Sequence, residues 1–232
     1  MNAGRELAPG EQPVRVWDLP TRVFHWLLAG LVVFSVVTAT IGGNAMVWHM
    51  RSGFAIFTLL AFRLVWGFAG GHWSRFRAFL YAPSTSLRYL RGESLPHEHH
   101  QVGHNPLGAG SVFALLGILA LQVATGLIAD DEIATTGPLI KYVGSATSGL
   151  ATSWHKNYGK WIIIGLVLLH LGAIAFYWFR RRQNLVGPMW HGDKLLAADV
   201  PRAVDNGRSR TIALVVLFVC ALGVTAVVRL GG

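Results

Sequence analysis

The chain has 232 residues, of which 53% are hydrophobic and only 13% are charged, and its mean hydropathy is +0.45. This composition is too apolar for an ordinary soluble domain, and it excludes a disordered chain or a collagen-like rod. The single cysteine, Cys220, excludes a disulfide scaffold, an all-cysteine iron–sulfur cluster and a covalently attached c-type haem. We therefore expect an integral membrane protein that holds any redox centre through other ligands.

The chain begins with a polar segment, residues 1–20, which has no apolar run followed by a small-residue cleavage site. We therefore expect no cleavable signal peptide. Apolar windows of roughly 20 residues, the length that crosses a hydrocarbon core about 30 Å thick, predict five membrane spans. These spans cover residues 21–41, 47–68, 107–129, 156–179 and 211–230.

The spans predict an all-α integral membrane bundle with four segments of different character. Residues 1–20 form a cytoplasmic N-terminal segment, and residues 21–179 form a four-helix membrane domain. Residues 180–210 form a second cytoplasmic loop, and residues 211–232 form a fifth transmembrane helix. No loop is long enough to hold a second catalytic domain.

The formal net charge of +9 is a topology signal. Most of the 20 lysines and arginines lie in the N-terminal segment, the loop between spans two and three, and the loop between spans four and five. These three segments lie on one side of the membrane, so the positive-inside rule predicts a cytoplasmic N-terminus and a C-terminus on the opposite side. The sequence has no groove-reading or RNA-binding motif, and we expect no nucleic-acid partner.

Four histidines lie in or at the ends of the predicted spans: His25, His49, His155 and His170. A single intramembrane histidine is more often a hydrogen-bonded core residue than a ligand, but the depths of these four match in pairs. His155 and His170 are separated by about 22 Å along a helix and by about 60° around it. With the alternating directions of the spans, His49 pairs with His155 near the outer face, and His25 pairs with His170 near the inner face.

Two facing histidines suit a six-coordinate iron whose other four positions are filled by a porphyrin. Zinc or iron without a porphyrin needs more protein ligands, and no carboxylate or cysteine accompanies either pair. The residues therefore predict two non-covalent b-type haems with His25, His49, His155 and His170 as axial ligands.

A short repeated pattern, W-H-x-x-x-G, surrounds two of these histidines. It places Gly53 one turn after His49 and Gly159 one turn after His155. A glycine on the ligand's face removes a side chain that would collide with a macrocycle. The alternative is that these glycines only allow close packing of membrane helices.

Two arginines, Arg51 and Arg63, lie within the second predicted span. A buried arginine needs an anionic partner, and haem propionates are suitable ones. The alternative is that each side chain extends to the nearer membrane surface.

Several motifs in residues 14–180 resemble the family of bacterial cytochrome b561 and nickel–iron hydrogenase b-type cytochrome subunits. They are Arg22-Val23-Phe24-His25-Trp26, His49-Met50-Arg51-Ser52-Gly53, Arg63-Leu64-Val65-Trp66, Gly103-His104-Asn105-Pro106-Leu107-Gly108-Ala109, Asp130-Asp131-Glu132-Ile133 with Gly137-Pro138, and the pair His155 and His170. The resemblance implies a four-helix bundle with two stacked haem b groups that passes electrons between quinone and a partner redox protein. It assigns axial ligation to the same four histidines. The fifth span contains no histidine, so we expect it to serve packing or partner docking.

Three further polar features have open interpretations. His104 stands at the inner mouth of the third span, where it suits either proton transfer to a quinone, a hydrogen bond to a propionate, or loop structure. His97, His99 and His100 have a spacing that binds metals weakly, although a solvated loop is the stronger interpretation. The acidic run Asp130, Asp131 and Glu132 suits a basic soluble redox partner, but more often such a run is a solvated cap and loop.

The sequence thus predicts a dihaem b-type cytochrome that carries electrons between the quinone pool and a periplasmic cytochrome c, hydrogenase or dehydrogenase. Whether the chain is itself an enzyme depends on whether it oxidises quinol or reduces quinone, and no quinone pocket is evident from the residues. The alternatives are a haem-free transporter whose histidines relay protons, and a membrane anchor subunit of a periplasmic oxidoreductase.

Overall fold

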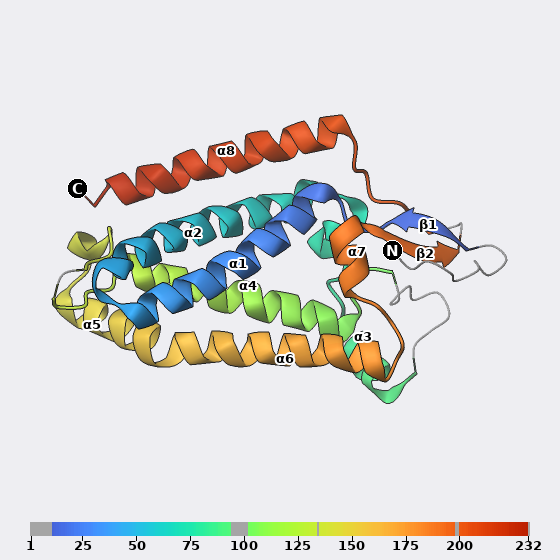
Figure 1. Ribbon diagram of the computed structural model, residues 1–232, viewed down its shortest axis with the longest axis horizontal. Helices are drawn as coiled ribbons and strands as arrows, with labels where there is room; N and C mark the ends of the chain where they lie inside the picture. Colours follow the sequence, from blue (N-terminus) through green and yellow to red (C-terminus); the bar gives the residue numbers. More distant parts are fainter. Residues whose placement is uncertain (1–10, 94–101, 134, 198–199, 232) are drawn as a thin grey trace. The chain divides into compact units, whose positions relative to one another are not determined.

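The computed structural model describes residues 11–93, 102–133, 135–197 and 200–231. Five of its helices are long and apolar enough to cross a membrane, which confirms the predicted all-α membrane bundle (Figure 1). These five are Leu19–Ile41, Gly43–Ala69, Pro106–Leu127, Ser145–Phe179 and Gly207–Arg229.

The helices and strands follow one another in a simple order. The helices are α1 (Leu19–Ile41), α2 (Met46–Ala69), α3 (Pro83–Arg91), α4 (Pro106–Leu127), α5 (Ser145–Ser153), α6 (Lys160–Phe179), α7 (Val186–His191) and α8 (Gly207–Arg229). Short 3-10 turns lie at Gly43–Ala45, His72–Ser74, Phe76–Ala78 and Ile140–Tyr142, and the strands are β1 (Glu11–Arg15) and β2 (Asp193–Ala197).

The fourth span is longer than the sequence predicted. The helix begins at Ser145 rather than near residue 156. The prediction missed this first part because α5 is built from small and hydroxylated residues, which an apolar window overlooks. Between α5 and α6 the chain forms one stretch of π-helix, Trp154–Gly159, which carries His155. π-helical turns inside longer helices are frequent at functional sites.

The chain divides into two compact units. The first, which we call the loop unit, contains residues 1–22, 66–110 and 174–213. The second, the helix unit, contains residues 23–65, 111–173 and 214–232.

A small antiparallel sheet organises the loop unit, a feature that the sequence did not predict. Strand β1 pairs with β2 so that Arg15 lies opposite Asp193 and Val14 opposite Lys194. Behind the sheet, apolar side chains from distant segments form one core, which contains Val14, Val16, Trp17, Trp73, Val102 and Val200. This core joins the N-terminal segment to both long loops.

A buried carboxylate, Asp18, fixes the loop that follows α2. Its side chain is fully buried and accepts hydrogen bonds from the backbone nitrogen of Thr21, Trp66 Nε1, the backbone nitrogen of Gly71 and Ser74 Oγ, at 2.7–3.1 Å. Buried charge is tolerated only when donors surround it, as they do here. Gly71 is needed at this point, because a Cβ there would lie 2.5 Å from Asp18 Oδ2.

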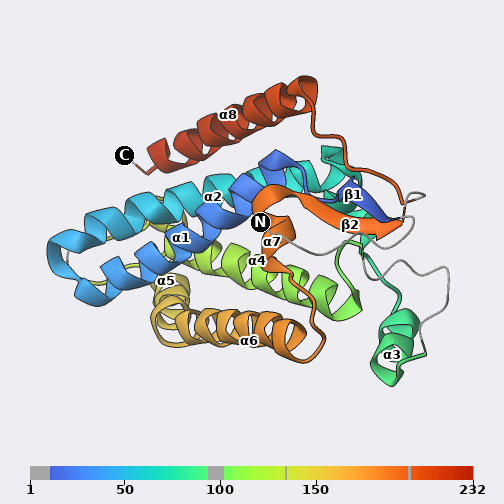
Figure 2. The same ribbon diagram turned by 45° about the vertical axis from the view of Figure 1, so that its right-hand side comes forward.

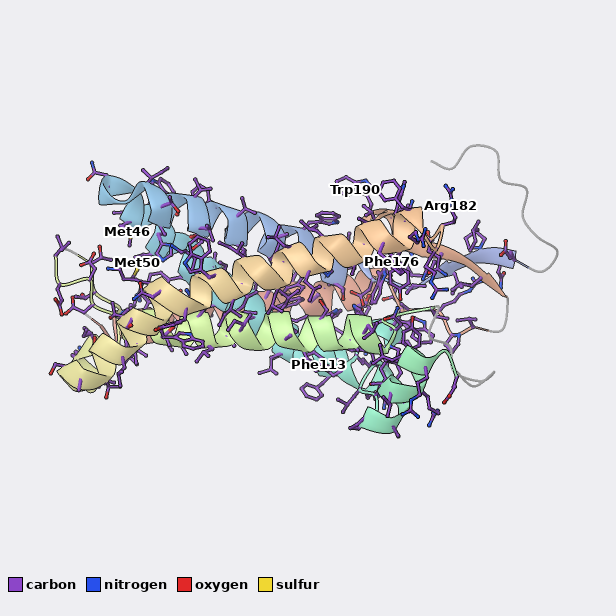
Figure 3. All side chains as sticks on the ribbon, turned by 90° about the horizontal axis from the view of Figure 1, so that it is seen from below. Met46, Met50, Phe113, Phe176, Arg182 and Trp190 are labelled. Atoms are coloured by element: carbon purple, nitrogen blue, oxygen red, sulfur yellow. The ribbon has the colours of Figure 1, made fainter. Side chains whose placement is uncertain are left out.

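Within the helix unit, α1, α2, α4 and α6 lie side by side, and α8 lies beside α2 (Figures 1 and 2). Its most buried apolar side chains include Ile56, Leu59, Phe62, Leu119 and Ile163. Large side chains on the outer surface point away from the helices, as Phe113 of α4 does at 37% exposure (Figure 3). Such an outward apolar surface is what lipid contact requires.

Candidate functional site

The helix unit brings four histidines together as two facing pairs. The ring centres of His25 on α1 and His170 on α6 are 6.4 Å apart, with an angle of 51° between the ring planes. The ring centres of His49 on α2 and His155 on the π-helical turn are 5.9 Å apart, with an angle of 85°. All four side chains are half-buried.

These separations can be compared with the space that one metal ion needs. Two metal–nitrogen bonds of about 2 Å each, together with the two ring radii, place the centres of opposed imidazoles roughly 6 Å apart. Both pairs therefore have the spacing of axial ligands on opposite sides of one ion. Among the described residues there is no group of three or more histidines, cysteines and carboxylates that could hold a bare metal ion. The two-nitrogen donor sets suit a metal whose remaining positions are filled by a macrocycle.

Backbone carbonyls orient both rings of the His49–His155 pair. His49 Nδ1 lies 3.0 Å from the carbonyl oxygen of Ser35 and 3.0 Å from its hydroxyl. His155 Nδ1 lies 2.9 Å from the carbonyl oxygen of Gln122 and 3.4 Å from Thr125 Oγ1. A carbonyl can only accept, so each Nδ1 carries the proton, and each Nε2 is left as a lone-pair donor.

The His25–His170 pair has a different environment. His25 Nδ1 is buried and has no hydrogen-bond partner among the described residues. The His25 ring instead meets the indole of Trp26 edge-on, with ring centres 5.0 Å apart. The two pairs are thus chemically unequal, because carbonyl acceptors orient both rings of the His49–His155 pair, whereas His25 Nδ1 has no such acceptor in the part of the chain that the structure describes.

The two glycines of the W-H-x-x-x-G pattern have different surroundings. At Gly53 no described atom lies within 4 Å of the position a Cβ would take, so the space beside His49 is open. At Gly159 that position is occupied by the side-chain amide of Gln122, with Trp154 Nε1 at 3.1 Å. The absence of a side chain at Gly159 therefore makes room for Gln122. The open space at Gly53 suits the predicted clearance for a macrocycle beside His49.

Arg51 and Arg63 also differ from each other. Arg51 is exposed, and its guanidinium lies 5.0 Å from the centre of the Trp48 indole. This stacking favours a position at the membrane surface over burial beside a cofactor. Arg63 is only 4% exposed, so its head group does not extend to the surface of the described chain.

His104 lies in the loop unit, where its ring is held between two aromatic rings. The ring centres of Trp17 and Phe79 are both 4.7 Å from that of His104. The neighbouring Asn105 caps α4, since its Oδ1 accepts from the backbone nitrogen of Gly108 at 2.8 Å. These contacts favour the interpretation of His104 as part of the loop structure.

The remaining polar features have structural partners or lie outside the described residues. His97, His99 and His100 fall in residues 94–101, which the structure does not describe. In the acidic run, Asp130 Oδ1 accepts from the backbone nitrogen of Glu132, and Asp131 Oδ1 accepts from the backbone nitrogens of Ile133 and Thr135. Both aspartates therefore shape their own loop, as the cap-and-loop interpretation predicts.

Sequence reasoning missed Ser35 and Gln122, the two residues whose carbonyls orient the histidines. Backbone acceptors leave no trace in a sequence. The one available signal was Gln122 itself, a polar side chain near the end of an otherwise apolar span, because such residues in membrane helices usually hydrogen-bond to a neighbouring helix.

A bundle of apolar helices with two opposed histidine pairs defines the class of membrane-embedded b-type cytochromes. The family model described as prokaryotic cytochrome b561 matches residues 16–192. The chain belongs to this family, and thus functions in membrane electron transfer with b-type haem.

Curated relatives extend the likeness over most of the chain. A probable Ni/Fe-hydrogenase B-type cytochrome subunit of Bradyrhizobium diazoefficiens is 24% identical over 83% of this chain and 90% of its own length. Subunits with the same name from Azotobacter chroococcum and Rhizobium leguminosarum are 25% and 26% identical, over 85% and 84% of this chain and 95% and 94% of their own lengths. No solved structure matches the chain.

Proposed function

We propose that this chain holds two haem b groups, one between His25 and His170 and the other between His49 and His155, and carries electrons across the bacterial inner membrane. The observation that supports this most directly is the ring-centre spacing of both pairs, 6.4 Å and 5.9 Å, in one helix unit. His155 and His170 are 15 residues apart on one helix, which separates the two sites by about 22 Å along it. Two sites at different depths suit a path across a bilayer.

Each haem, when bound, would supply a one-electron iron couple whose potential depends on ligand basicity and burial. The protein's own residues would determine those properties. His49 and His155 would present Nε2 to the metal because Ser35 and Gln122 hold the opposite nitrogens. Gly53 would leave room beside His49, and Arg63, a buried cation, would compensate the charge of a propionate.

We further propose that the electrons pass between the quinone pool and a redox protein on the periplasmic side, with the N-terminus cytoplasmic and the C-terminus periplasmic. The distribution of basic residues supports this orientation. The printed names of the relatives support a nickel–iron hydrogenase as the partner, and a cytochrome c or a dehydrogenase would fit the same chemistry. Quinol oxidation or quinone reduction would then make the complex an oxidoreductase.

A transporter whose histidines relay protons without haem is a weaker alternative. Such a relay needs acidic side chains within the spans, and α1, α2, α4, α6 and α8 contain no Asp or Glu. A plain membrane anchor leaves the two facing pairs unexplained.

A pyridine haemochrome assay and a reduced-minus-oxidised spectrum of the detergent-purified chain test the proposal. We expect two b-type haems per polypeptide with low-spin spectra. One haem per chain would reduce the proposal to a single pair, and a haem-free, folded chain would overturn it in favour of the relay or the anchor.

A further inference from the structure

Helix α3 (Pro83–Arg91) lies in the loop unit, between the membrane helices α2 and α4 along the chain. Both of its ends are well defined. Pro83 begins the helix, and Gly92 ends it in a left-handed conformation with φ 76°, donating its backbone hydrogen to the carbonyls of Arg88 and Tyr89. The helix α3 is thus well formed, and the contacts of its exposed face remain to be explained.

Hydrogen bonds hold α3 where two membrane helices end. The hydroxyl of Tyr89 lies 2.9 Å from that of Tyr177, and Asn105 Nδ2 donates to the Tyr177 hydroxyl at 2.8 Å. Tyr177 is two residues before the end of the span Ser145–Phe179, and Asn105 directly precedes the span Pro106–Leu127. The end of one span and the beginning of another lie at a membrane surface, so α3 is fixed at that depth.

The outward face of α3 is apolar, although its inward face is polar. Leu87 and Leu90 are 48% and 62% exposed, and Leu80 in the preceding turn is 71% exposed. Thr85 and Tyr89 are half-buried, and the Tyr89 hydroxyl contacts that of Tyr177. Leu87 and Leu90 lie about 60° apart around the helix axis, and exposed leucines that share a face mark an interaction surface. We call Leu80, Leu87 and Leu90 the leucine face.

Arginines accompany this apolar surface. Arg91 is exposed and lies about 40° from Leu87 around the helix axis, and Arg77 is exposed in the turn before the helix. Residues 70–93 also contain Arg75 and Arg88, against a single acidic residue, Glu93. A cationic rim around leucines complements a layer of anionic headgroups above acyl chains.

We propose that α3 is an interfacial anchor that lies in the headgroup layer of the bilayer, with the leucine face in the acyl boundary and the arginines on anionic lipid headgroups. The tether to Tyr177 and Asn105 sets the depth, and the exposed leucines and arginines supply the contacts. This proposal does not depend on how many haems the chain binds.

Site-directed fluorescence on the full chain in vesicles tests the proposal. In a Cys220→Ala background, an environment-sensitive dye is attached at Leu87→Cys or Leu90→Cys, with Val204→Cys as the matched control. Val204 is also an exposed aliphatic residue of the loop unit, at 56% exposure, but it does not belong to the leucine face. The vesicles contain either phosphatidylcholine alone or phosphatidylcholine with phosphatidylglycerol, and some carry spin-labelled acyl chains.

We expect blue-shifted emission and quenching by the spin-labelled lipid at positions 87 and 90, and neither effect at position 204. Quenching at 87 and 90 should increase with phosphatidylglycerol, and the double variant Arg77→Gln/Arg91→Gln should lose this increase. Water-like emission without quenching at both positions would overturn the proposal and show that the leucine face serves another partner. Insertion that is insensitive to phosphatidylglycerol would overturn the part assigned to the arginines.

Hydrogen–deuterium exchange of the unmodified chain provides a second test that needs no variant. In nanodiscs, the amides of α3 should exchange more slowly when phosphatidylglycerol is present, whereas those of α7 should not change. Equal exchange of α3 in both lipid compositions would contradict the proposed contact with anionic headgroups.

Discussion

Gln122 is hydrogen-bonded to His155 from two sides. Its carbonyl oxygen accepts from the imidazole Nδ1 at 2.9 Å, and its side-chain Nε2 donates to the His155 carbonyl oxygen at 2.9 Å. The rest of the amide fills the space that a side chain at Gly159 would need. The orientation of the His155 ring, the position of its main chain and the absence of a side chain at Gly159 therefore all depend on Gln122.

We predict that Gly159→Ala destabilises the His49–His155 site by about 1–3 kcal/mol, because the added methyl group displaces the Gln122 amide. Gln122→Ala should weaken haem retention at the same site. In the double variant the methyl group has room, so Gly159→Ala should add little to the effect of Gln122→Ala, and the coupling should be about 0.5–3 kcal/mol.

This cycle is measured as haem retention during thermal unfolding in detergent. Gly223→Ala on α8 is the matched control, because no described atom lies within 4 Å of its Cβ position. Strictly additive effects of the two substitutions would show that Gly159 and Gln122 act independently.

Removing one histidine of a pair should remove one haem and spare the other. His170→Ala should abolish binding between His25 and His170, because a single imidazole leaves one axial position empty. His155→Ala should do the same for the other site. Haem content per polypeptide should fall by about half in each variant, as expected for two sites with separate ligand pairs. Unchanged content and spectra in either variant would contradict the proposed pairing.

Asp18→Asn should destabilise the loop unit by about 2–4 kcal/mol. The substituted amide brings two donors into a site where Thr21, Trp66, Gly71 and Ser74 all present donors. Thermal unfolding in detergent measures the change. Asp193→Asn, at a partly exposed ion pair with Arg15, is the comparison and should cost less. If the two substitutions lowered the free energy of unfolding equally, burial of Asp18 would not add to its contribution to stability.

Stability should rise with pH above about pH 8 because of Lys194. Burial lowers the pKa of this side chain from 10.5 to about 8, and its Nζ donates to the Val102 carbonyl at 3.4 Å. Between these two values the unfolded chain binds more protons than the folded chain, so the free energy of unfolding increases with pH, by at most about 3 kcal/mol. Unfolding of the chain and of Lys194→Met should be compared across this window. If the free energy of unfolding of Lys194→Met rose with pH by the same amount, the pH dependence would belong to another group.

At low pH the stability of the chain should fall because Asp205 becomes protonated. Burial raises the pKa of this carboxyl, but hydrogen bonds from Arg210, the Leu19 backbone and Arg15 outweigh it, so the pKa lies below its ordinary value. The stabilisation is complete above the ordinary pKa of an aspartate and is lost as the pH falls through the lowered value. Asp205→Asn should therefore unfold more readily at neutral pH and show a flatter acid limb of the stability curve. An unchanged acid limb would contradict this role.

Local patterns along the chain were enough to predict the membrane spans and the position of each histidine on its helix. Hydropathy and the helical repeat are local properties, so the positions of His25, His49, His155 and His170 along their helices follow from residue numbers alone. This local information was incomplete where a helix is not apolar. The helical segment that begins at Ser145 consists mostly of small and hydroxylated residues, so an apolar window did not include it.

The surroundings of those histidines and the contacts that hold the loops could not be predicted in this way, because they join segments that are far apart in the sequence. Gln122 and Gly159 are 37 positions apart, Arg15 of β1 and Asp193 of β2 are 178 positions apart, and Tyr89 of α3 and Tyr177 of α6 are 88 positions apart. Their contacts depend on where the backbone brings distant residues together, and several of them use main-chain atoms that every residue has. Main-chain contacts carry no residue-type signal, which is why the two orienting carbonyls emerged only from the folded chain. The position of α3 emerged there too, because the hydroxyl groups of Tyr89 and Tyr177 meet only after the chain has folded.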